Sequence, residues 1–271
     1  MNDLKRHYSI IIVTYNNAEG LRRTLKSIRQ LDYEQKEVIV MDGGSKDESL
    51  DIMADNRDII NVSVSERDNG IYNAMNKGVR QAKGDFVVFM NAGDVFADAG
   101  VLSLVSQYDG DIILGEDIYG GVRRRLNEQV TLYELLSNGI YHQAVYYRRR
   151  VLQQYGFDES YKLIADLKSV VEPFVKDRIA VTCIRQPLAI CESGGVSKVR
   201  WRDTLTENRR LIDELVESPY KDDYQKLARI NSSMIDDFIV LSAFRSTFPL
   251  LRMLARIVRF LNDRFKHIPI E

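Results

Sequence analysis

Polar side chains that could bind a phosphate, a sugar or a metal follow four apolar stretches in the first hundred residues. The four clusters are Thr14-Tyr15-Asn16, Asp42-Gly43, Asp68-Asn69-Gly70 and Asn91-Ala92-Gly93-Asp94. The carboxyl ends of parallel strands meet at one edge of a sheet, where ligands bind in open α/β folds. The carboxylate of Asp94 suits a divalent cation, because Mg²⁺ takes one or two carboxylates and completes its shell with substrate phosphates and water.

Each cluster taken alone also has a purely structural interpretation. An aspartate that follows a strand often caps the next helix, and this applies to Asp47 and Asp68 alike. The sequence contains neither a glycine-rich dinucleotide fingerprint nor a P-loop, so neither of those phosphate sites is expected. The gathering of four polar clusters at one predicted sheet edge is what favours a ligand site.

The order of apolar segments predicts strands that alternate with helices. Residues 8–13, 37–41, 60–64 and 86–90 read as strands, and the segments between them carry polar turns and apolar residues at helical spacing. Such alternation specifies a parallel sheet with right-handed crossovers. We therefore expect residues 1–100 to form a doubly wound, nucleotide-binding layer.

Beyond residue 100 the pattern is less regular. The expected helices are 101–108, 131–137, 148–155 and 165 to about 175, and the expected strands are 111–114, 142–147, 179–184 and 188–191, with a hairpin turn at 119–121. From residue 202 onward the sequence reads as helical. We expect a catalytic domain over residues 1–200, with a nucleotide-binding half (about 1–100) and an acceptor half (about 101–200), followed by a helical extension over 201–271.

Composition is that of an ordinary soluble globular protein. The 271 residues are 45% hydrophobic and 28% charged, and the net charge of −1 gives no reason to expect nucleic acid as a partner. Cys183 and Cys191 lie in apolar surroundings without metal-ligand spacing, which fits a reducing cytoplasm. The apolar run near the N-terminus is too short for a signal peptide, and no stretch is long enough to span a membrane.

Several motifs in order resemble the family-2 glycosyltransferases of the GT-A fold. They are SIIIVTYNN, EVIVMDGGSKD, DNGIYNAMNKG with AKGDFVVFMNAGD, and a later HQA, FDES and AD. The resemblance extends over roughly residues 8–197 and is strongest to bacterial enzymes that build exopolysaccharide or O-antigen units, the colanic-acid type included. It implies a Rossmann-like, doubly wound α/β fold with a mostly parallel sheet. It also implies inverting sugar transfer from a nucleotide-sugar, commonly UDP-linked, to a glycan or lipid-linked saccharide.

The resemblance also implies roles for individual residues. The nucleotide-sugar would be held by Thr14, Tyr15, Asn16, Asp42, Gly43, Asp68, Asn76, Lys77 and Asn91. Asp42 would bond the base, and Lys77 would lie near the diphosphate. The segment 91–94 occupies the place of the family's DxD motif, but Asn91 and Gly93 replace its first and middle acidic residues. The last carboxylate is kept as Asp94, which would hold Mn²⁺ or Mg²⁺.

The base that takes the acceptor's proton is expected to be Asp166, because Ala165-Asp166 stands where the family keeps a catalytic carboxylate at a helix start. The alternative is that Asp166 only caps that helix. Glu116 and Asp117 are reserve candidates on the acceptor side. His142 is either an acceptor contact or a structural histidine. A single base, with a metal to stabilise the leaving diphosphate, fits an inverting displacement.

Two further segments have open interpretations. The stretch 193–198 is either a loop that closes on the diphosphate or a linker. Residues 238–266 interleave apolar and basic side chains, which suits a helix at the inner face of the plasma membrane, or one packed on the catalytic domain or a second subunit. Oligomerisation is left open.

The rival functions are a nucleotidyltransferase and a non-catalytic sugar-nucleotide-binding or assembly subunit of the same fold. The first would need a glycine-rich, basic loop after the first strand, and residues 14–17 lack one. The second would have lost turnover together with the missing acids of the DxD motif.

Overall fold

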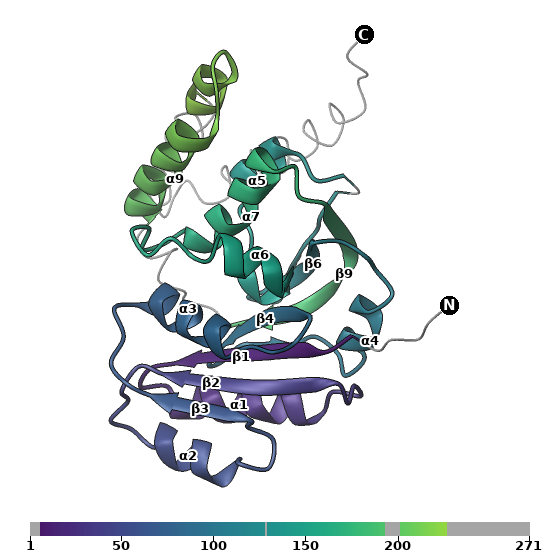
Figure 1. The fold of residues 1–271 in the computed structure, drawn as a ribbon, viewed down its shortest axis with the longest axis vertical. Helices are drawn as coiled ribbons and strands as arrows, with labels where there is room; N and C mark the ends of the chain where they lie inside the picture. Colours follow the sequence, from purple (N-terminus) through teal and green to yellow (C-terminus); the bar gives the residue numbers. More distant parts are fainter. Residues whose placement is uncertain (1–5, 128, 193–200, 227–271) are drawn as a thin grey trace, which may run out of the picture. The chain divides into compact units, whose positions relative to one another are not determined.

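The computed structural model describes residues 6–127, 129–192 and 201–226 (Figure 1). The segments 193–198 and 238–266 therefore lie outside the described residues. Contacts divide the chain into two units, residues 1–217 and 218–271. The first unit includes the helix α9 (Trp201–Leu215), which the sequence had assigned to the extension. The division of the chain at residue 200 stays a prediction.

The N-terminal half of the sheet contains the four strands expected from the sequence. They are β1 (Tyr8–Thr14), β2 (Lys36–Asp42), β3 (Val62–Ser65) and β4 (Phe86–Asn91), all parallel, in the order β3-β2-β1-β4. In the register, Thr14 pairs with Asp42 and Val13 pairs with Asn91. The polar ends of β1, β2 and β4 therefore meet at one edge.

Helices cover both faces of β1, β2 and β4, which is why these strands are mostly apolar on both sides. Helix α1 (Ala18–Arg29) contributes Leu21, Leu25 and Ile28 to one core cluster. Helix α3 (Ile71–Gln81) contributes Tyr72, Met75 and others to the second cluster. Figure 1 shows α1 and α3 on opposite faces, with α2 (Ser49–Asp55) beyond β3.

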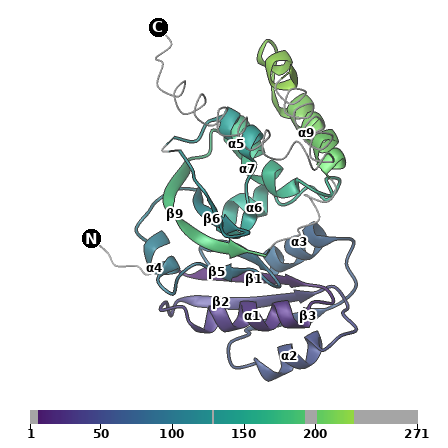
Figure 2. The same ribbon diagram turned by 180° about the vertical axis from the view of Figure 1, so that it is seen from behind.

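The second half of the sheet adds β5 (Val95–Phe96), β6 (Ile112–Tyr119), β7 (Val122–Arg124), β8 (Val145–Arg148) and β9 (Val181–Cys191). The order continues β4-β8-β6-β9-β5, with β7 beside β6. Parallel pairings cover four to eight residues each, whereas antiparallel pairings cover two or three. The α/β fold with a mostly parallel sheet is thus confirmed, and β9 curves strongly (Figure 2).

Several element boundaries differ from the sequence expectation. Strand β6 continues to Tyr119, because the charges of Glu116 and Asp117 are paired with arginines of β7. Strand β9 is continuous, and a bulge opposite β6 accommodates the break at Pro187. The expected strand 142–147 begins as a 3₁₀ helix, η1 (His142–Ala144). No pattern in the sequence predicts the two-residue strand β5.

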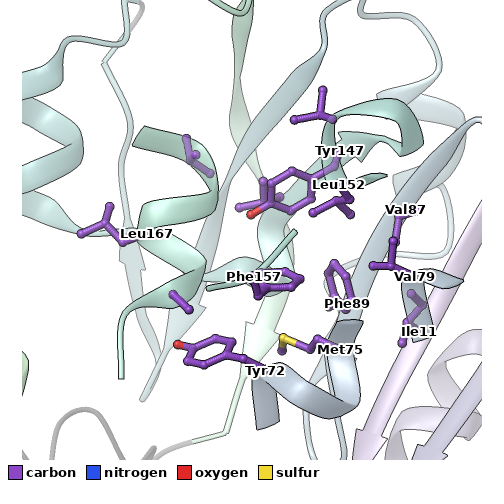
Figure 3. Close-up of a cluster of buried hydrophobic side chains, with 14 of the residues drawn as sticks. Ile11, Tyr72, Met75, Val79, Val87, Phe89, Tyr147, Leu152, Phe157 and Leu167 are labelled. Atoms are coloured by element: carbon purple, nitrogen blue, oxygen red, sulfur yellow. The ribbon is translucent and has the colours of Figure 1, made fainter. Parts of the chain in front are cut away.

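The remaining helices are α4 (Val101–Val105), α5 (Leu132–Asn138), α6 (Arg149–Gln154), α7 (Ala165–Lys176) and α9. An aromatic cluster ties α3 and β4 to the segment between α6 and α7 (Figure 3). The Phe157 ring lies 5.1 Å from that of Phe89 and 5.8 Å from that of Tyr72. This packing fixes Tyr72 beside the start of α7. None of the described helices is long and apolar enough to cross a membrane.

Candidate active site

Hydrogen bonds join the loop after β1 to the loop after β2. Asn16 adopts a left-handed backbone conformation with φ of 48°, which Asn tolerates better than most residues. Its backbone N–H donates to Ser45 Oγ at 2.8 Å, and its side-chain Oδ1 accepts from the Lys46 N–H at 2.8 Å. Asn16 thus shapes the edge, while the neighbouring Tyr15 is 63% exposed.

Asp42 organises the turn that follows β2. Its carboxylate accepts from the N–H groups of Gly44 (3.2 Å) and Ser45 (3.0 Å). It also accepts from the hydroxyls of Ser45 and Ser65. The residue is only 3% exposed, so its oxygens serve mainly these internal bonds. Bonding of a nucleotide base by Asp42 stays a prediction.

Gly43 lies against two predicted nucleotide contacts, Tyr15 and Asp68. A Cβ atom placed on Gly43 would lie 2.7 Å from Asp68 Oδ2 and 3.2 Å from Tyr15 Cδ2. An aromatic ring and a carboxylate therefore face each other across a residue without a side chain. Asp68 also accepts from the Gly70 N–H at 2.9 Å through Oδ1, and its Oδ2 lies against Gly43.

Asn76 and Lys77 both bond other groups of the protein, and their contact with a nucleotide stays a prediction. The Asn76 amide bonds both backbone groups of Phe157 (2.8 and 2.9 Å) and the carboxylate of Glu159 (2.9 Å). Lys77 pairs with Glu66 at 2.6 Å. Asn76 thus holds the segment before α7, and Lys77 holds the loop before Asp68. Asp47 acts as a cap, because it accepts from the N–H groups of Ala18 and Ser49.

The turn after β4 is fixed by helix α1. The Thr24 hydroxyl accepts from the Gly93 N–H at 3.0 Å and donates to the backbone oxygen of Asp94 at 2.7 Å. Gly93 has a φ of 113°, in the region that favours glycine. The turn presents the Asp94 carboxylate inward, where it is 4% exposed.

The two oxygens of Asp94 bond residues from distant parts of the chain. Oδ2 accepts from Gln143 Nε2 at 2.6 Å, and Oδ1 accepts from the Glu192 N–H at 2.8 Å. Burial raises the pKa of Asp94 despite these bonds. A buried carboxylate of this kind is stabilised by a nearby cation.

The residues around Asp94 suit a divalent cation completed by substrate. The described residues contain no cluster of three His, Cys, Asp or Glu side chains that would form a cage. Asn91, three residues before Asp94, has a buried Oδ1 that bonds no described group. One carboxylate with a free amide oxygen nearby fits Mg²⁺ or Mn²⁺, whose remaining ligands are phosphate oxygens and water.

The predicted base, Asp166, lies in the first turn of α7 and bonds two side chains from elsewhere. Its Oδ2 lies 3.0 Å from His142 Nδ1, and its Oδ1 accepts from the Tyr72 hydroxyl at 3.0 Å. Oδ1 also accepts from the Leu167 N–H at 2.9 Å, so Asp166 caps its own helix in addition. Burial, and then the neighbouring Asp166, raise the pKa of Tyr72 well above its usual value, which keeps its hydroxyl a donor.

Adjacent residues of η1 connect the predicted metal ligand with the predicted base. His142 bonds Asp166, and Gln143 bonds Asp94. Both side chains are buried, yet His142 Nε2 and Gln143 Oε1 have no partner in the described part of the chain. Unpartnered buried polar atoms at one place indicate a ligand that would satisfy them. Thr14 Oγ1, at the end of β1, is buried and unpartnered as well.

The β6–β7 hairpin contacts the residue that precedes η1. Glu116 and Asp117 are buried in β6 and form ion pairs with Arg123 and Arg124. The Arg124 guanidinium also lies 4.1 Å from the ring centre of Tyr141, the residue before His142. The two acids thus take part in holding the hairpin, and their contact with an acceptor stays a prediction.

Sequence reasoning did not identify Gln143 and Glu192 as site residues. Gln143 stands beside His142 in the HQA motif, and this adjacency was the available signal. Glu192 follows a strand that pairs with β5, a contact without any local pattern. Its carboxylate pairs with Arg23 and lies against Gly93, where a Cβ atom would be 2.2 Å from Oε2.

Relatives are found in one family of enzymes. The family model described as glycosyl transferase family 2 matches residues 9–164, more than half of the chain. A PGL/p-HBAD biosynthesis glycosyltransferase of Mycobacterium tuberculosis (strain ATCC 25618 / H37Rv) is 34% identical over an alignment of 173 positions, which covers 59% of this chain and 66% of that protein. This chain thus spans just under two thirds of that relative's length.

Solved structures show the same fold at low sequence identity. Staphylococcus aureus TarS 1–349 in complex with UDP-GlcNAc has a TM-score of 0.63 and 19% identity, covering 81% of this chain and 70% of that one. The mannosyltransferase PcManGT from Pyrobaculum calidifontis, in complex with GDP-Man and Mn²⁺, has a TM-score of 0.64 and 14% identity, covering 94% and 86%. The fold is therefore of the GT-A type. The family model that matches more than half of the chain establishes that the chain belongs to glycosyltransferase family 2.

Proposed function

We propose that this protein is a metal-dependent, inverting glycosyltransferase. It moves a sugar from a nucleotide-sugar, UDP-linked in our proposal, to a saccharide or lipid-linked saccharide in the synthesis of a bacterial exopolysaccharide or O-antigen. The observation that carries the proposal is the η1 turn, in which Gln143 bonds Asp94 and His142 bonds Asp166. The η1 turn thus holds two carboxylates. Asp94 is suited to the leaving diphosphate, and Asp166 is suited to the acceptor.

The donor occupies the edge formed by the ends of β1, β2 and β4. The Tyr15 ring and Asp68 Oδ2 face each other across Gly43, an arrangement suited to a base that stacks and donates a hydrogen bond. Related folds bind UDP-GlcNAc and GDP-Man, which supports a nucleotide-sugar here. The nucleotide's identity is part of the proposal.

Asp94 and Asn91 are the residues that would hold Mn²⁺ or Mg²⁺. A bound ion supplies Lewis-acid stabilisation of the charge that develops on the leaving diphosphate. The PcManGT and mycobacterial glucosyl-3-phosphoglycerate synthase complexes contain Mn²⁺. In this chain, the Gln143 amide and the Glu192 N–H orient the Asp94 carboxylate.

Asp166 accepts the proton of the acceptor hydroxyl. As that oxygen bonds the anomeric carbon, its proton passes to the Asp166 carboxylate and the bond between the anomeric carbon and the diphosphate oxygen breaks. Tyr72 and His142 orient the carboxylate, and the buried Nε2 of His142, which bonds no described group, would bond the acceptor. A single displacement inverts the anomeric configuration.

The place of action is part of the same proposal. A nucleotide-sugar donor and a lipid-linked acceptor meet at the cytoplasmic face of the plasma membrane, and a peripheral enzyme suits that position. The basic amphipathic segment 238–266, which would provide the contact, lies outside the described residues.

One observation favours a second candidate, a non-catalytic sugar-nucleotide-binding subunit. Asn91 and Gly93 replace two acids of the usual metal motif, and a chain with weakened metal binding would bind donor without transferring it. Wild-type protein that binds a nucleotide-sugar and neither transfers nor hydrolyses it would favour this candidate.

The test of the proposal is calorimetric titration of the full chain with UDP, GDP and dTDP, each with and without Mn²⁺. We expect one nucleotide to bind in the micromolar range, and this binding to weaken on chelation of the metal. No binding of any of the three nucleotides, with or without metal, would contradict the proposal.

A further inference from the structure

Helix α9 contacts the segment that leads into Asp166. The Glu207 carboxylate accepts from three consecutive N–H groups, those of Lys162 (2.7 Å), Leu163 (2.9 Å) and Ile164 (3.1 Å). Helix α7 begins at the next residue, and Asp166 follows. Ile164 stands at the N-cap with an apolar side chain that cannot cap the helix. A carboxylate more than forty residues away in the sequence instead holds the backbone immediately before the helix.

The segment 157–164 is held from two sides. On one side, Asn73 and Asn76 of α3 bond the Glu159 carboxylate at 2.9 Å each. On the other side, Glu207 of α9 accepts hydrogen bonds from the N–H groups of residues 162–164. The backbone segment that leads into Asp166 is therefore held by hydrogen bonds from both α3 and α9.

Helix α9 is itself anchored to α7. The buried Lys168 ammonium of α7 lies 2.8 Å from Glu214 of α9 and 2.8 Å from Asp158. Leu211 and Leu215 of α9 belong to the same core cluster as Tyr72. The helix is therefore a fixed support for Glu207. It lies beyond residues 9–164, where the family model matches, and neither the matched model nor the sequence motifs include it.

We propose that Glu207 is a positioning residue for the catalytic carboxylate. By holding the three N–H groups before α7, it sets where the first turn of that helix, and with it Asp166, stands relative to His142 and the acceptor. Its negative charge near the N-terminus of α7 also complements the helix dipole. The inference rests on the proposed function for the role of Asp166, and displacement of a catalytic group by about 1 Å costs roughly 100-fold in rate.

The test compares Glu207→Gln with Glu214→Gln in the full chain. The glutamine in the first variant keeps the side-chain shape but offers one acceptor oxygen, and its amino group faces N–H donors. Glu214 lies on the same helix and anchors it through Lys168 and Arg210, yet it bonds no backbone group before Asp166 in the described contacts. The two variants therefore separate positioning of Asp166 from docking of α9.

Three quantities are measured on both variants and on the wild type. They are the affinity for UDP with Mn²⁺, the release of UDP from UDP-N-acetylglucosamine and UDP-glucose, and amide hydrogen exchange at residues 162–167. For Glu207→Gln we expect unchanged UDP affinity, a fall in kcat of roughly 10- to 100-fold, and faster exchange at these amides. For Glu214→Gln we expect a kcat close to wild type. Glu207→Asp, which keeps the charge at shorter reach, should fall between.

Two results would overturn the inference. One is a Glu207→Gln variant with wild-type kcat or wild-type exchange at residues 162–164. The other is an equal loss of kcat in Glu207→Gln and Glu214→Gln, accompanied by equal losses of Tm, which would make α9 a stabilising element only. A wild type that releases no UDP from either donor would instead contradict the proposed function, and the exchange data would still decide whether Glu207 holds the segment.

Discussion

The two halves of the sheet position their polar residues in different ways. In the half made of β1 to β4, the polar residues directly follow their strands and bond mostly to the adjoining loops, as Asp42 does with Ser45. In the other half, the site is assembled over long sequence distances. Asp166 bonds Tyr72 across 94 residues, and Asp94, which follows β4 and joins the two halves, bonds Glu192 across 98.

This difference indicates a division of labour between the halves. The donor side is shaped by local turns at the ends of parallel strands, so it would form as soon as the sheet forms. The acceptor side depends on contacts between η1, α3, α7 and α9. Substitutions in the first half should therefore affect nucleotide binding, and substitutions in the second should affect turnover.

The largest effect is expected from Asp94→Ala, because Asp94 belongs to both halves. Loss of the proposed metal ligand removes several kcal/mol of stabilisation of the leaving group, which is roughly 1,000-fold or more in turnover. UDP affinity measured by calorimetry should also lose its dependence on Mn²⁺. Metal-dependent nucleotide binding that persists in this variant would show that the cation is held elsewhere.

A smaller loss is expected from Gln143→Leu. The substitution removes the 2.6 Å bond to Asp94 and leaves the volume of the side chain nearly unchanged. Loss of a group that orients a metal ligand typically costs about 10- to 100-fold in metal affinity or activity. We expect a reduced Mn²⁺ affinity and a reduced kcat, measured by titration of activity with Mn²⁺. An unchanged Mn²⁺ dependence would indicate that η1 does not connect the two halves.

Gly43→Ala examines the first half alone. The added Cβ would approach Asp68 Oδ2 to 2.7 Å, so the carboxylate must move away from residue 43. We expect UDP affinity to fall by about one order of magnitude, or about 1.4 kcal/mol, with kcat at saturating donor little changed. The Tm serves as the control, and a fall in kcat with unaltered affinity would reverse the assigned roles of the halves.

The smallest effect concerns acid stability of the second half. Partial burial would raise the pKa of Asp158, but hydrogen bonds from Lys168 and Ser160 outweigh it and lower the pKa to about 2. The unfolded value is about 3.9, so the stability from Asp158 is present above that pH and is lost as the pH falls toward 2. Urea unfolding should show that Asp158→Asn is less stable than wild type at pH 5. The two proteins should converge near pH 2, and a constant difference would contradict the linkage.

Sequence reasoning identified most of the first half because its signals are local. The runs 8–13, 37–41 and 86–90 are apolar throughout or nearly so and end in turn residues, so their strands and the polar edge followed from pattern alone. The grouping of Tyr15, Gly43 and Asp68 is a consequence of that edge.

The second half was predicted less well because its contacts are not local. Strand β9 was expected as two strands, since Arg185-Gln186-Pro187 interrupts the apolar pattern that only the pairing with β6 makes continuous. Asn76 bonds Phe157, which is 81 residues away, a partner that no local pattern indicates, and its contact with the nucleotide stays a prediction. No pattern around Glu207 or Glu192 distinguishes them from ordinary surface acids, so only the structure reveals their partners.

The most direct test of the account is Asp166→Asn, with turnover and nucleotide affinity measured on the same preparation. Asn keeps the shape of the side chain but cannot take the acceptor's proton, and a general base contributes about 10²- to 10⁴-fold. We predict a loss of UDP release in this range, with Mn²⁺-dependent UDP affinity within about twofold of wild type, because the donor side is built separately. Turnover within a few-fold of wild type would contradict the assignment of Asp166 as the base and, with it, the division of the site between the two halves.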